Sequence, residues 1–212
     1  MFLDFENELT LRIHLGIYGK WSFVDLGDSI PEPVGQVRAR FQNQTSMADL
    51  RGPTVCEVIT QQEVRMVENR LGPDPLNPDR NGLEARKFIE RVRSSKTSIG
   101  QLLMNQEVIS GIGNVYRAEL LFRAQVNPYV AGESLSEEQL SAIWRDSVDL
   151  LKVGVAKGVM ITRDELRNKN PKKSERNFVY KREGQPCLVC QQEIAIDLMA
   201  TRKLYFCPNC QK

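Results

Sequence analysis

Apolar and polar residues alternate along the first part of the chain. Leu9, Leu11, Ile13 and Leu15 are separated by polar side chains, and the later stretch GQVRARF alternates again. Successive side chains of a β-strand point to opposite faces, so a period of two is typical of half-buried strands. We therefore predict a β domain over residues 1–70.

The first of these strands runs into a turn bounded by two glycines, in the sequence GIYG. Ile17 and Tyr18 occupy the tip of this turn. Apolar side chains in such a place usually cover a core, although they can also serve as a wedge that unstacks bases. The residues alone leave both interpretations open.

The pattern then changes to a helical period. Leu140, Ile143, Leu151 and Val155 recur at spacings that place them on one face of a helix. Three pairs of residues have the spacing and composition of capping boxes, which mark helix starts: Thr60 with Glu63, Ser98 with Gln101, and Ser136 with Gln139. The proline-rich stretch LGPDPLNPDR interrupts this region, so we predict an interdomain linker over residues 71–80 and a helical domain over residues 81–162.

A glycine-rich turn precedes the most distinctive helix of this domain. In SGIGNVYRAELLF, Gly111 and Gly113 interrupt the helical pattern. Asn114 is predicted as the N-cap of a helix with Val115, Ala118 and Phe122 on one apolar face. Backbone N–H groups at such a helix N-terminus attract anions. The turn is therefore either an anion site or only the bend of a helical hairpin.

Charge is distributed unevenly along the chain, although the net charge is only +2. Residues 1–60 carry five basic and eight acidic side chains, whereas residues 161–212 carry eleven basic and six acidic ones. Residues 163–183 contain eight basic, four acidic and few apolar side chains, so we predict a mobile basic loop there. A basic C-terminal segment on an otherwise nearly neutral chain favours a polyanionic binding partner.

Four of the five cysteines form two CxxC pairs, separated by sixteen residues. This spacing is typical of structural sites in which four thiolates hold one Zn²⁺. A redox pair would need one CxxC inside a βαβ unit, which the sequence does not offer. We therefore predict a zinc finger over residues 184–212, with one structural Zn²⁺ bound by Cys187, Cys190, Cys207 and Cys210.

The stretches EIAIDL and RKLYF, between the cysteine pairs, are predicted as the two strands of a hairpin. Arg202 begins the second strand. It is either the residue that the finger presents to a partner or an ordinary solvated arginine. The fifth cysteine, Cys56, alternates with apolar neighbours and is predicted to be a small buried side chain.

The sequence has the features neither of a secreted protein nor of a membrane protein. Hydrophobic residues make up 41% and charged residues 26% of the chain, which is typical of a globular protein. No stretch resembles a signal peptide or reaches the length of a membrane span. We therefore expect a cytoplasmic protein without a membrane partner.

These parts, in this order, resemble the formamidopyrimidine-DNA glycosylase/endonuclease VIII family. The resemblance rests on IHLGIYG, LGPDPL and GIGNVYRAELLF, and on a CxxC…CxxC hairpin with an arginine five residues before its third cysteine. It implies an α+β fold with a truncated N-terminal β-sandwich, a helix–two-turn–helix domain and a C-terminal zinc finger. It also implies a bacterial, nucleoid-associated monomer that binds double-stranded DNA with damaged bases or abasic sites in the cleft between the domains.

The resemblance assigns roles in base-excision repair to single residues. The family removes oxidised bases as a DNA glycosylase and then nicks the abasic site as an AP lyase. Asn114 corresponds to a phosphate-binding asparagine, and Arg202 to the finger arginine that grips the phosphate beside the flipped-out nucleotide. His14 corresponds to a position near the DNA backbone, with a purely structural histidine as the alternative.

Other positions correspond to residues that the family uses when a base leaves the stack. Ile17 and Tyr18 match the loop that fills the hole left by the extruded base, and Arg51 matches an arginine that faces the orphaned base. The formamidopyrimidine branch usually has a Met in the wedge and a Phe near this arginine. Ile-Tyr and Gly-Pro at these places favour the endonuclease VIII branch and oxidised pyrimidines.

The family's chemistry uses a proline after the initiator Met as the amine nucleophile and a neighbouring glutamate as acid and base. The stretch MFLDFENE matches a later strand of the family, so this Pro-Glu pair and a lysine just before the strand have no counterpart. We therefore expect no catalytic residue in these 212 residues. The chain is either the remainder of a bifunctional glycosylase/AP lyase or a non-catalytic DNA-binding module. A zinc-ribbon adaptor for other proteins is a third class, which would not bind DNA.

Overall fold

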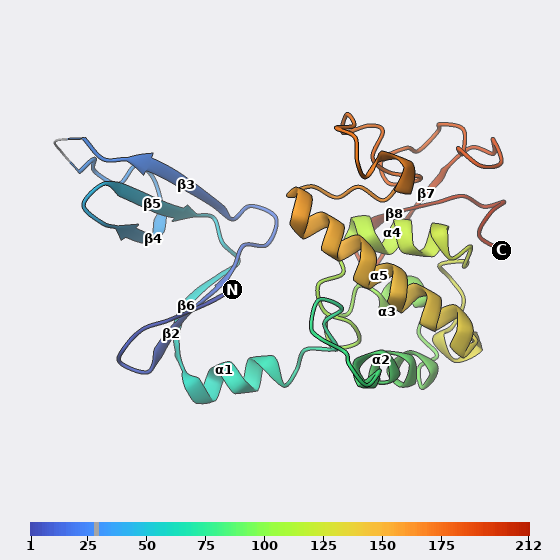
Figure 1. The fold of residues 1–212 in the computed structure, drawn as a ribbon, viewed down its shortest axis with the longest axis horizontal. Helices are drawn as coiled ribbons and strands as arrows, with labels where there is room; N and C mark the ends of the chain where they lie inside the picture. The colour runs from blue at the N-terminus through green and yellow to red at the C-terminus, as the bar shows by residue number, and fades with distance from the viewer. Residues whose placement is uncertain (28–29) are drawn as a thin grey trace. The chain divides into compact units, whose positions relative to one another are not determined.

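The computed structural model describes residues 1–27 and 30–212. The chain divides into two compact units, residues 1–69 and residues 70–212 (Figure 1). The first unit is mainly β and the second is mainly helical. The fold is therefore of the α+β class that the sequence predicts, and the division falls just before the predicted linker at residues 71–80.

The first unit consists of two three-stranded antiparallel sheets followed by a short helix. Its strands are β1 (Phe2–Asp4), β2 (Leu9–His14), β3 (Lys20–Asp25), β4 (Val37–Gln42), β5 (Ser46–Arg51) and β6 (Val55–Thr60). The strand orders are β1–β2–β6 and β3–β5–β4. Helix α1 (Gln61–Glu68) follows β6, and the predicted capping box of Thr60 with Glu63 is present.

The alternation in the sequence accounts for only part of the burial in these sheets, since Thr10 is buried beside Leu11. Leu11 and Ile13 of β2 are 8% and 2% exposed, and together with the fully buried Leu50 of β5 they form a core that joins the two sheets. Other apolar side chains of the unit face solvent, including Phe23 at 78% and Val58 at 60% exposure. The first unit therefore buries only a small core.

The second unit is built around one long helix. Its helices are α2 (Leu83–Arg93), α3 (Ile99–Leu102), α4 (Asn114–Arg123) and α5 (Glu137–Lys157), with 3-10 turns η1 (Gly132–Ser134) and η2 (Asp164–Leu166). The predicted capping box of Ser136 with Gln139 starts α5, and Gly158 ends it with a φ of 66°. Helices α2 and α4 pack against α5 around a core that includes Phe88 and Leu120. None of the helices in the described residues is long and apolar enough to cross a membrane.

The predicted capping box of Ser98 with Gln101 is wrong. The Ser98 hydroxyl donates to Oε1 of Gln101 and caps no backbone N–H group of α3. The N–H group of Gln101, which a capping box would use, donates to the backbone carbonyl of Ser98 instead. Another segment of the chain satisfies the two preceding N–H groups, whose acceptors are the carbonyls of Val130 and Pro128. Helix α3 is a single turn of four residues.

Helix α4 lies next to α5 and to the finger (Figure 1), and the sides that contact them are buried. Leu120 and Leu121 pack into the core shared with α2 and α5, whereas Ala118 and Phe122 pack against the finger. The hairpin of the finger consists of β7 (Ala195–Met199) and β8 (Arg202–Phe206). Every residue of α4 from Tyr116 onward to Phe122 is buried, whereas the sequence pattern predicted a single apolar face.

Two segments without regular structure are attached to the second unit by hydrogen bonds. In the predicted linker, Gly72 N–H donates to the carbonyl of Gln106, and Ser110 N–H donates to the carbonyl of Pro73. Residues 163–183 contain η2 and further backbone turns. The domain boundaries inside this unit and the mobility of the basic segment stay predictions.

Candidate metal centre and nucleic-acid interface

The four cysteines of the two CxxC pairs converge on one point. Their Sγ atoms all lie within 4.8 Å of one another, with 3.4 Å between Cys190 and Cys207 and 3.9 Å between Cys187 and Cys210. Four thiolates bound at about 2.3 Å to a tetrahedral ion would be separated by about 3.8 Å. The donor set therefore fits a closed four-coordinate metal site at the positions that the sequence predicts.

Backbone and side-chain hydrogen bonds surround these sulfurs. The N–H group of Val189 donates to Sγ of Cys187 at 3.4 Å. A hydrogen bond from Asn209 lowers the pKa of the Cys190 thiol to about 6, whereas burial raises the pKa of Cys207. A cation between the sulfurs would favour the thiolate form of every ligand, because the thiolate is the species that binds metal.

One cysteine pair precedes and the other follows the hairpin that carries Arg202. Strands β7 and β8 pair antiparallel, with Met199 opposite Arg202. Ala200 and Thr201 form the connecting turn with φ angles of 52° and 60°, the left-handed values of a tight two-residue hairpin turn. Arg202 follows this turn directly and its side chain is exposed, so its charge is accessible from solvent.

Asn114 connects helix α4 to this hairpin, although not as the predicted N-cap. Gly113 is the N-cap, and Asn114 is the first helical residue. The Nδ2 atom of Asn114 donates to the carbonyl of Lys203 at 2.8 Å, and its Oδ1 atom accepts a hydrogen bond from Arg117. The side chain of Asn114 is therefore directed to β8, which is why it does not cap its own helix.

Arg117 is the residue at this junction that the sequence analysis did not single out. It is fully buried, and its guanidinium donates to the carbonyls of Met199 and Lys203, on the two strands of the hairpin, and to Asn114. Burial, and then the nearby charge of Arg202, lower the pKa of Arg117 to about 10, so it remains protonated at neutral pH. Two arginines and the positive end of α4 therefore converge here.

The end of β2 and the turn after it carry three of the remaining candidate residues. His14 ends β2 and is exposed, and 68% of Ile17 and 83% of Tyr18 are accessible to solvent. The interpretation of these two apolar residues as a cover for the core is therefore wrong. The backbone of the turn is nevertheless held, because Gly19 N–H donates to the carbonyl of Leu15 at 2.8 Å.

Arg51, at the end of β5, makes three polar contacts within the first unit. Its guanidinium donates to Oδ2 of Asp49 at 2.8 Å, to the hydroxyl of Ser22 at 2.9 Å and to the carbonyl of Val34 at 3.0 Å. The side chain is 35% exposed, so these contacts fix its direction and leave part of it accessible. Cys56 of the same unit is half-buried, in partial agreement with its predicted burial.

Comparison with known proteins identifies the family that shares these features. Residues 71–165 match the formamidopyrimidine-DNA glycosylase H2TH domain. Over 218 residues the chain is 43% identical to endonuclease 8 1 of Mycobacterium tuberculosis (strain H37Rv), which covers 100% of this chain and 80% of that protein. The chain belongs to the formamidopyrimidine-DNA glycosylase/endonuclease VIII family.

Within this family of DNA glycosylases the chain is closer to the endonuclease 8 branch. The formamidopyrimidine-DNA glycosylase of Mycoplasma genitalium is 31% identical over 212 residues, which cover 98% of this chain and 73% of that protein. The structure of the Lactococcus lactis formamidopyrimidine-DNA glycosylase, non-covalently bound to DNA containing an AP site, aligns with a TM-score of 0.77. Its identity is 22%, over 100% of this chain and 77% of that chain. The likeness confirms the fold class predicted from the sequence.

Proposed function

We propose that this chain recognises damaged double-stranded DNA in base-excision repair, as a monomer acting on the nucleoid in a bacterial cytoplasm. Its lesions are oxidised bases, pyrimidines in particular, and abasic sites. The observation that supports this proposal best is the hydrogen bond from Asn114 to Lys203. It joins the N-terminus of α4 to the strand that carries Arg202, and so brings two groups with affinity for phosphate to one place.

A DNA phosphate is the ligand that this junction fits best. The first N–H groups of a helix carry partial positive charge and bind anions. The guanidinium group of Arg202 adds a full positive charge, and its planar set of N–H donors suits phosphate oxygens. The buried charge of Arg117 adds positive potential from within the protein. Contacts of this kind hold a protein in register on the duplex without reading its sequence.

The exposed residues of the first unit complete the proposed recognition of a lesion. Ile17 and Tyr18 act as the wedge that replaces an extruded base in the stack. Arg51 faces the base that has lost its partner, and its contacts with Asp49 and Ser22 hold its direction before DNA binds. His14 lies near the DNA backbone.

We propose that the metal of the finger is a single Zn²⁺, bound by Cys187, Cys190, Cys207 and Cys210. Sulfur ligands at these separations suit its tetrahedral coordination. With four protein ligands no position is open to a substrate, so the ion supplies structural support and takes no part in catalysis. Its role is to hold the hairpin, and with it Arg202, against helix α4.

Substitution of the two phosphate-binding residues tests the proposed DNA contact. Arg202→Ala and Asn114→Ala are each expected to weaken binding by about 1–3 kcal/mol, the contribution of a charge-assisted or helix-terminus hydrogen bond. Arg202→Ala should also lower the slope of log affinity against log salt by about 0.9, because one cationic phosphate contact is lost, whereas Asn114→Ala removes no charge and should leave the slope nearly unchanged. Fluorescence anisotropy with a duplex that carries an abasic-site analogue, titrated at several salt concentrations, measures both quantities.

Arg145→Ala is the matched control for this experiment, because Arg145 is an exposed arginine on α5. It should bind the duplex like the parent, with the same salt slope. A parent-like affinity and slope for Arg202→Ala would show that the finger arginine does not bind phosphate. If the parent itself bound no duplex, the zinc-ribbon adaptor would become the better description.

We further propose that a polypeptide of these 212 residues recognises damage without excising the base. Excision needs an amine that is unprotonated near neutral pH and held against the sugar C1′, a need that an α-amino group with a pKa of about 7.7–8.0 meets. The Met1 amine instead donates to the carbonyl of Ile13 at 3.0 Å, beside the paired strands β1 and β2. Borohydride treatment with an abasic duplex should therefore trap no covalent adduct.

An adduct that disappears when one residue of the chain is replaced would reveal a substitute nucleophile and contradict this proposal. A second polypeptide, with a Met-Pro-Glu segment of a family member joined to the front, separates the two remaining descriptions. If the extended polypeptide formed a covalent adduct with abasic DNA and the original one did not, the result would support a role as part of a bifunctional glycosylase/AP lyase. No trapping by either polypeptide would support a non-catalytic DNA-binding module.

A further inference from the structure

Glu119 of helix α4 is a fully buried carboxylate that the proposed phosphate contacts do not involve. Both of its oxygens accept hydrogen bonds. Oε1 accepts from the backbone N–H groups of Val179 and Tyr180, each at 2.8 Å, and Oε2 accepts from the N–H group of Phe178 at 2.7 Å and from the hydroxyl of Thr162. Four donors from outside α4 therefore converge on one side chain.

These donors lie on either side of one stretch of chain, residues 163–177. Thr162 precedes the stretch, and Phe178 follows it. The backbone also closes at this point, because the N–H group of Thr162 donates to the carbonyl of Arg176 at 3.0 Å. Glu119 thus binds both ends of the stretch at one place. We refer to this set of hydrogen bonds, from Thr162 and residues 178–180 to Glu119, as the clasp.

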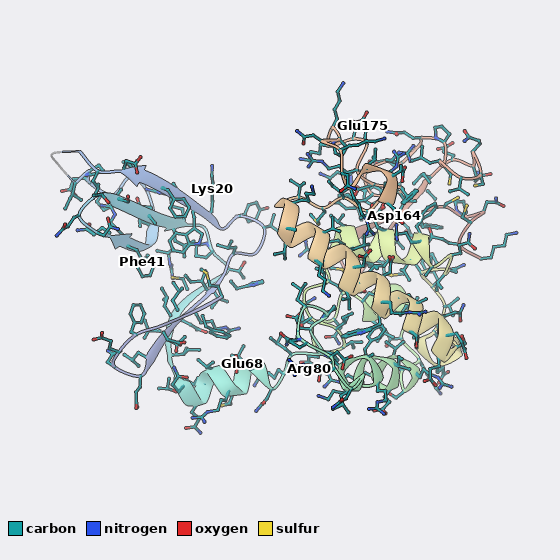
Figure 2. All side chains as sticks on the ribbon, in the orientation of Figure 1. Lys20, Phe41, Glu68, Arg80, Asp164 and Glu175 are labelled. Carbon is teal, nitrogen blue, oxygen red and sulfur yellow. The ribbon has the colours of Figure 1, made fainter. Side chains whose placement is uncertain are left out.

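Ion pairs secure the first part of the same stretch, whose two ends are marked by the labelled Asp164 and Glu175 in Figure 2. Asp164 accepts from Arg123 at 3.1 Å and from Arg167 at 2.6 Å. The later side chains Lys169, Lys172 and Lys173 are exposed, and none of their ammonium groups makes an ion pair with any residue that the structure describes.

We propose that Glu119 is a positioning residue for DNA binding, which closes residues 163–177 into a fixed loop so that Lys169, Lys172 and Lys173 contact the phosphate backbone. The proposal rests on the function proposed above. Three lysines on an open segment would bind DNA only after the segment had been ordered, at a cost in entropy, whereas a loop closed beforehand avoids much of this cost. Glu119 touches no DNA itself and acts through the three lysines.

The clasp can be tested without DNA, by limited trypsin digestion of the full chain at the basic residues of the loop. Glu119→Gln keeps the size of the side chain but places an NH₂ group where one oxygen accepts two hydrogen bonds. Digestion within residues 163–177 is expected to accelerate by about tenfold or more, as the loss of a buried charge-assisted hydrogen bond raises the population of the open loop. Thr162→Val, which removes one donor and keeps the shape, should give a smaller acceleration in the same direction.

Glu183→Gln is the matched control, because it removes the same charge at an exposed position outside the loop. It should be digested like the parent. If both Glu119→Gln and Thr162→Val were also digested like the parent, the clasp would not exist. Thr162→Val keeps this test decisive should Glu119→Gln fail to fold.

A double-mutant cycle on DNA tests whether the clasp acts through the lysines. The triple change Lys169→Gln, Lys172→Gln and Lys173→Gln should lower the salt slope for the abasic duplex by about 2–3 units, one phosphate contact for each lysine. Glu119→Gln, or Thr162→Val in its place, should lower the slope in the parent and leave it unchanged in the triple variant.

If the Glu119 or Thr162 substitution lowered the salt slope equally in the parent and in the triple lysine variant, this would show a general loss of folding and overturn the proposal. A triple lysine variant whose salt slope equalled that of the parent would overturn it as well, because the lysines would then make no contact. These outcomes require that the parent binds DNA. If the parent did not bind, the proposed function would fail, while the digestion experiment would still decide whether the clasp exists.

Discussion

Removal of the metal, or replacement of Cys207 by serine, is expected to unfold the hairpin and to weaken binding of an abasic duplex by about 100-fold or more, the effect of losing two phosphate contacts. Cys187 and Cys207 are fully buried and belong to the same apolar cluster as Phe122 and Tyr205. Loss of the metal therefore removes the support of this cluster. A structural Zn²⁺ contributes about 10 kcal/mol or more in isolated fingers, far more than a hairpin of two five-residue strands gains by itself.

Hydrogen exchange before and after chelation measures how far this unfolding extends. Protection should be lost over residues 184–212 and reduced in α4, whose Ala118 and Phe122 lose their cover. Helix α2 should keep its protection, because it packs into the other core of the unit. Equal loss over residues 81–160 would contradict a finger that unfolds separately.

Cys56→Ser is the control for the cysteine substitution. Cys56 lies in the first unit, where its Sγ atom faces the carbonyl of Arg38 at 3.8 Å, far along the chain from the metal ligands. This variant should retain one metal ion per chain and the affinity of the parent. A metal content of zero for Cys56→Ser would mean that the four-cysteine assignment is incomplete.

Replacement of Arg117 by methionine is expected to destabilise the second unit by about 2–4 kcal/mol and to weaken DNA binding as well. Methionine has a similar length but no donors, so the carbonyls of Met199 and Lys203 would each lose a hydrogen bond in a buried place. Removal of a buried charge offsets part of this cost, since burial already lowers the pKa of Arg117. Asn114 would lose the partner that orients its amide.

Urea unfolding and duplex titration of the same variant separate stability from binding. Arg145→Met is the control on an exposed part of α5, and its stability should remain within about 0.5 kcal/mol of the parent. A variant Arg117→Met that stayed folded at the titration temperature and bound DNA like the parent would show that Arg117 does not position Asn114 and Arg202.

The features that the sequence predicted correctly depend on neighbours close along the chain. The capping boxes at Thr60 and Ser136 need only a residue three positions later, and the strand alternation around Leu11 needs only a period of two. The capping predictions for Ser98 and Asn114 failed because distant groups compete for the same positions. At the first helix the carbonyl of Val130 accepts from the N–H group of Ile99, and the N–H group of Gln101 bonds to the backbone of Ser98. At the second helix the carbonyl of Lys203 accepts from the side chain of Asn114.

Arg117 and Glu119 were overlooked because both are charged residues inside a helix that was predicted to have one apolar face. The stretch YRAELLF did contain a signal, since apolar residues cover most of the circumference of this helix and leave only a narrow polar strip. A charged side chain in such a helix needs buried partners. Those partners are backbone groups of the finger and the basic segment, which no local pattern along α4 could have revealed.

The two-sided burial of α4 has a consequence for the synthesis of the protein. Asn114 leaves the ribosome long before Lys203, its partner 89 residues later. Domains fold progressively as the chain emerges, so α4 must wait with Ala118 and Phe122 uncovered until the cysteines have been made and have captured their metal. A cell short of that metal would therefore lose newly made chains to chaperones, aggregation or proteolysis, even though all the amino acids of the finger had been added.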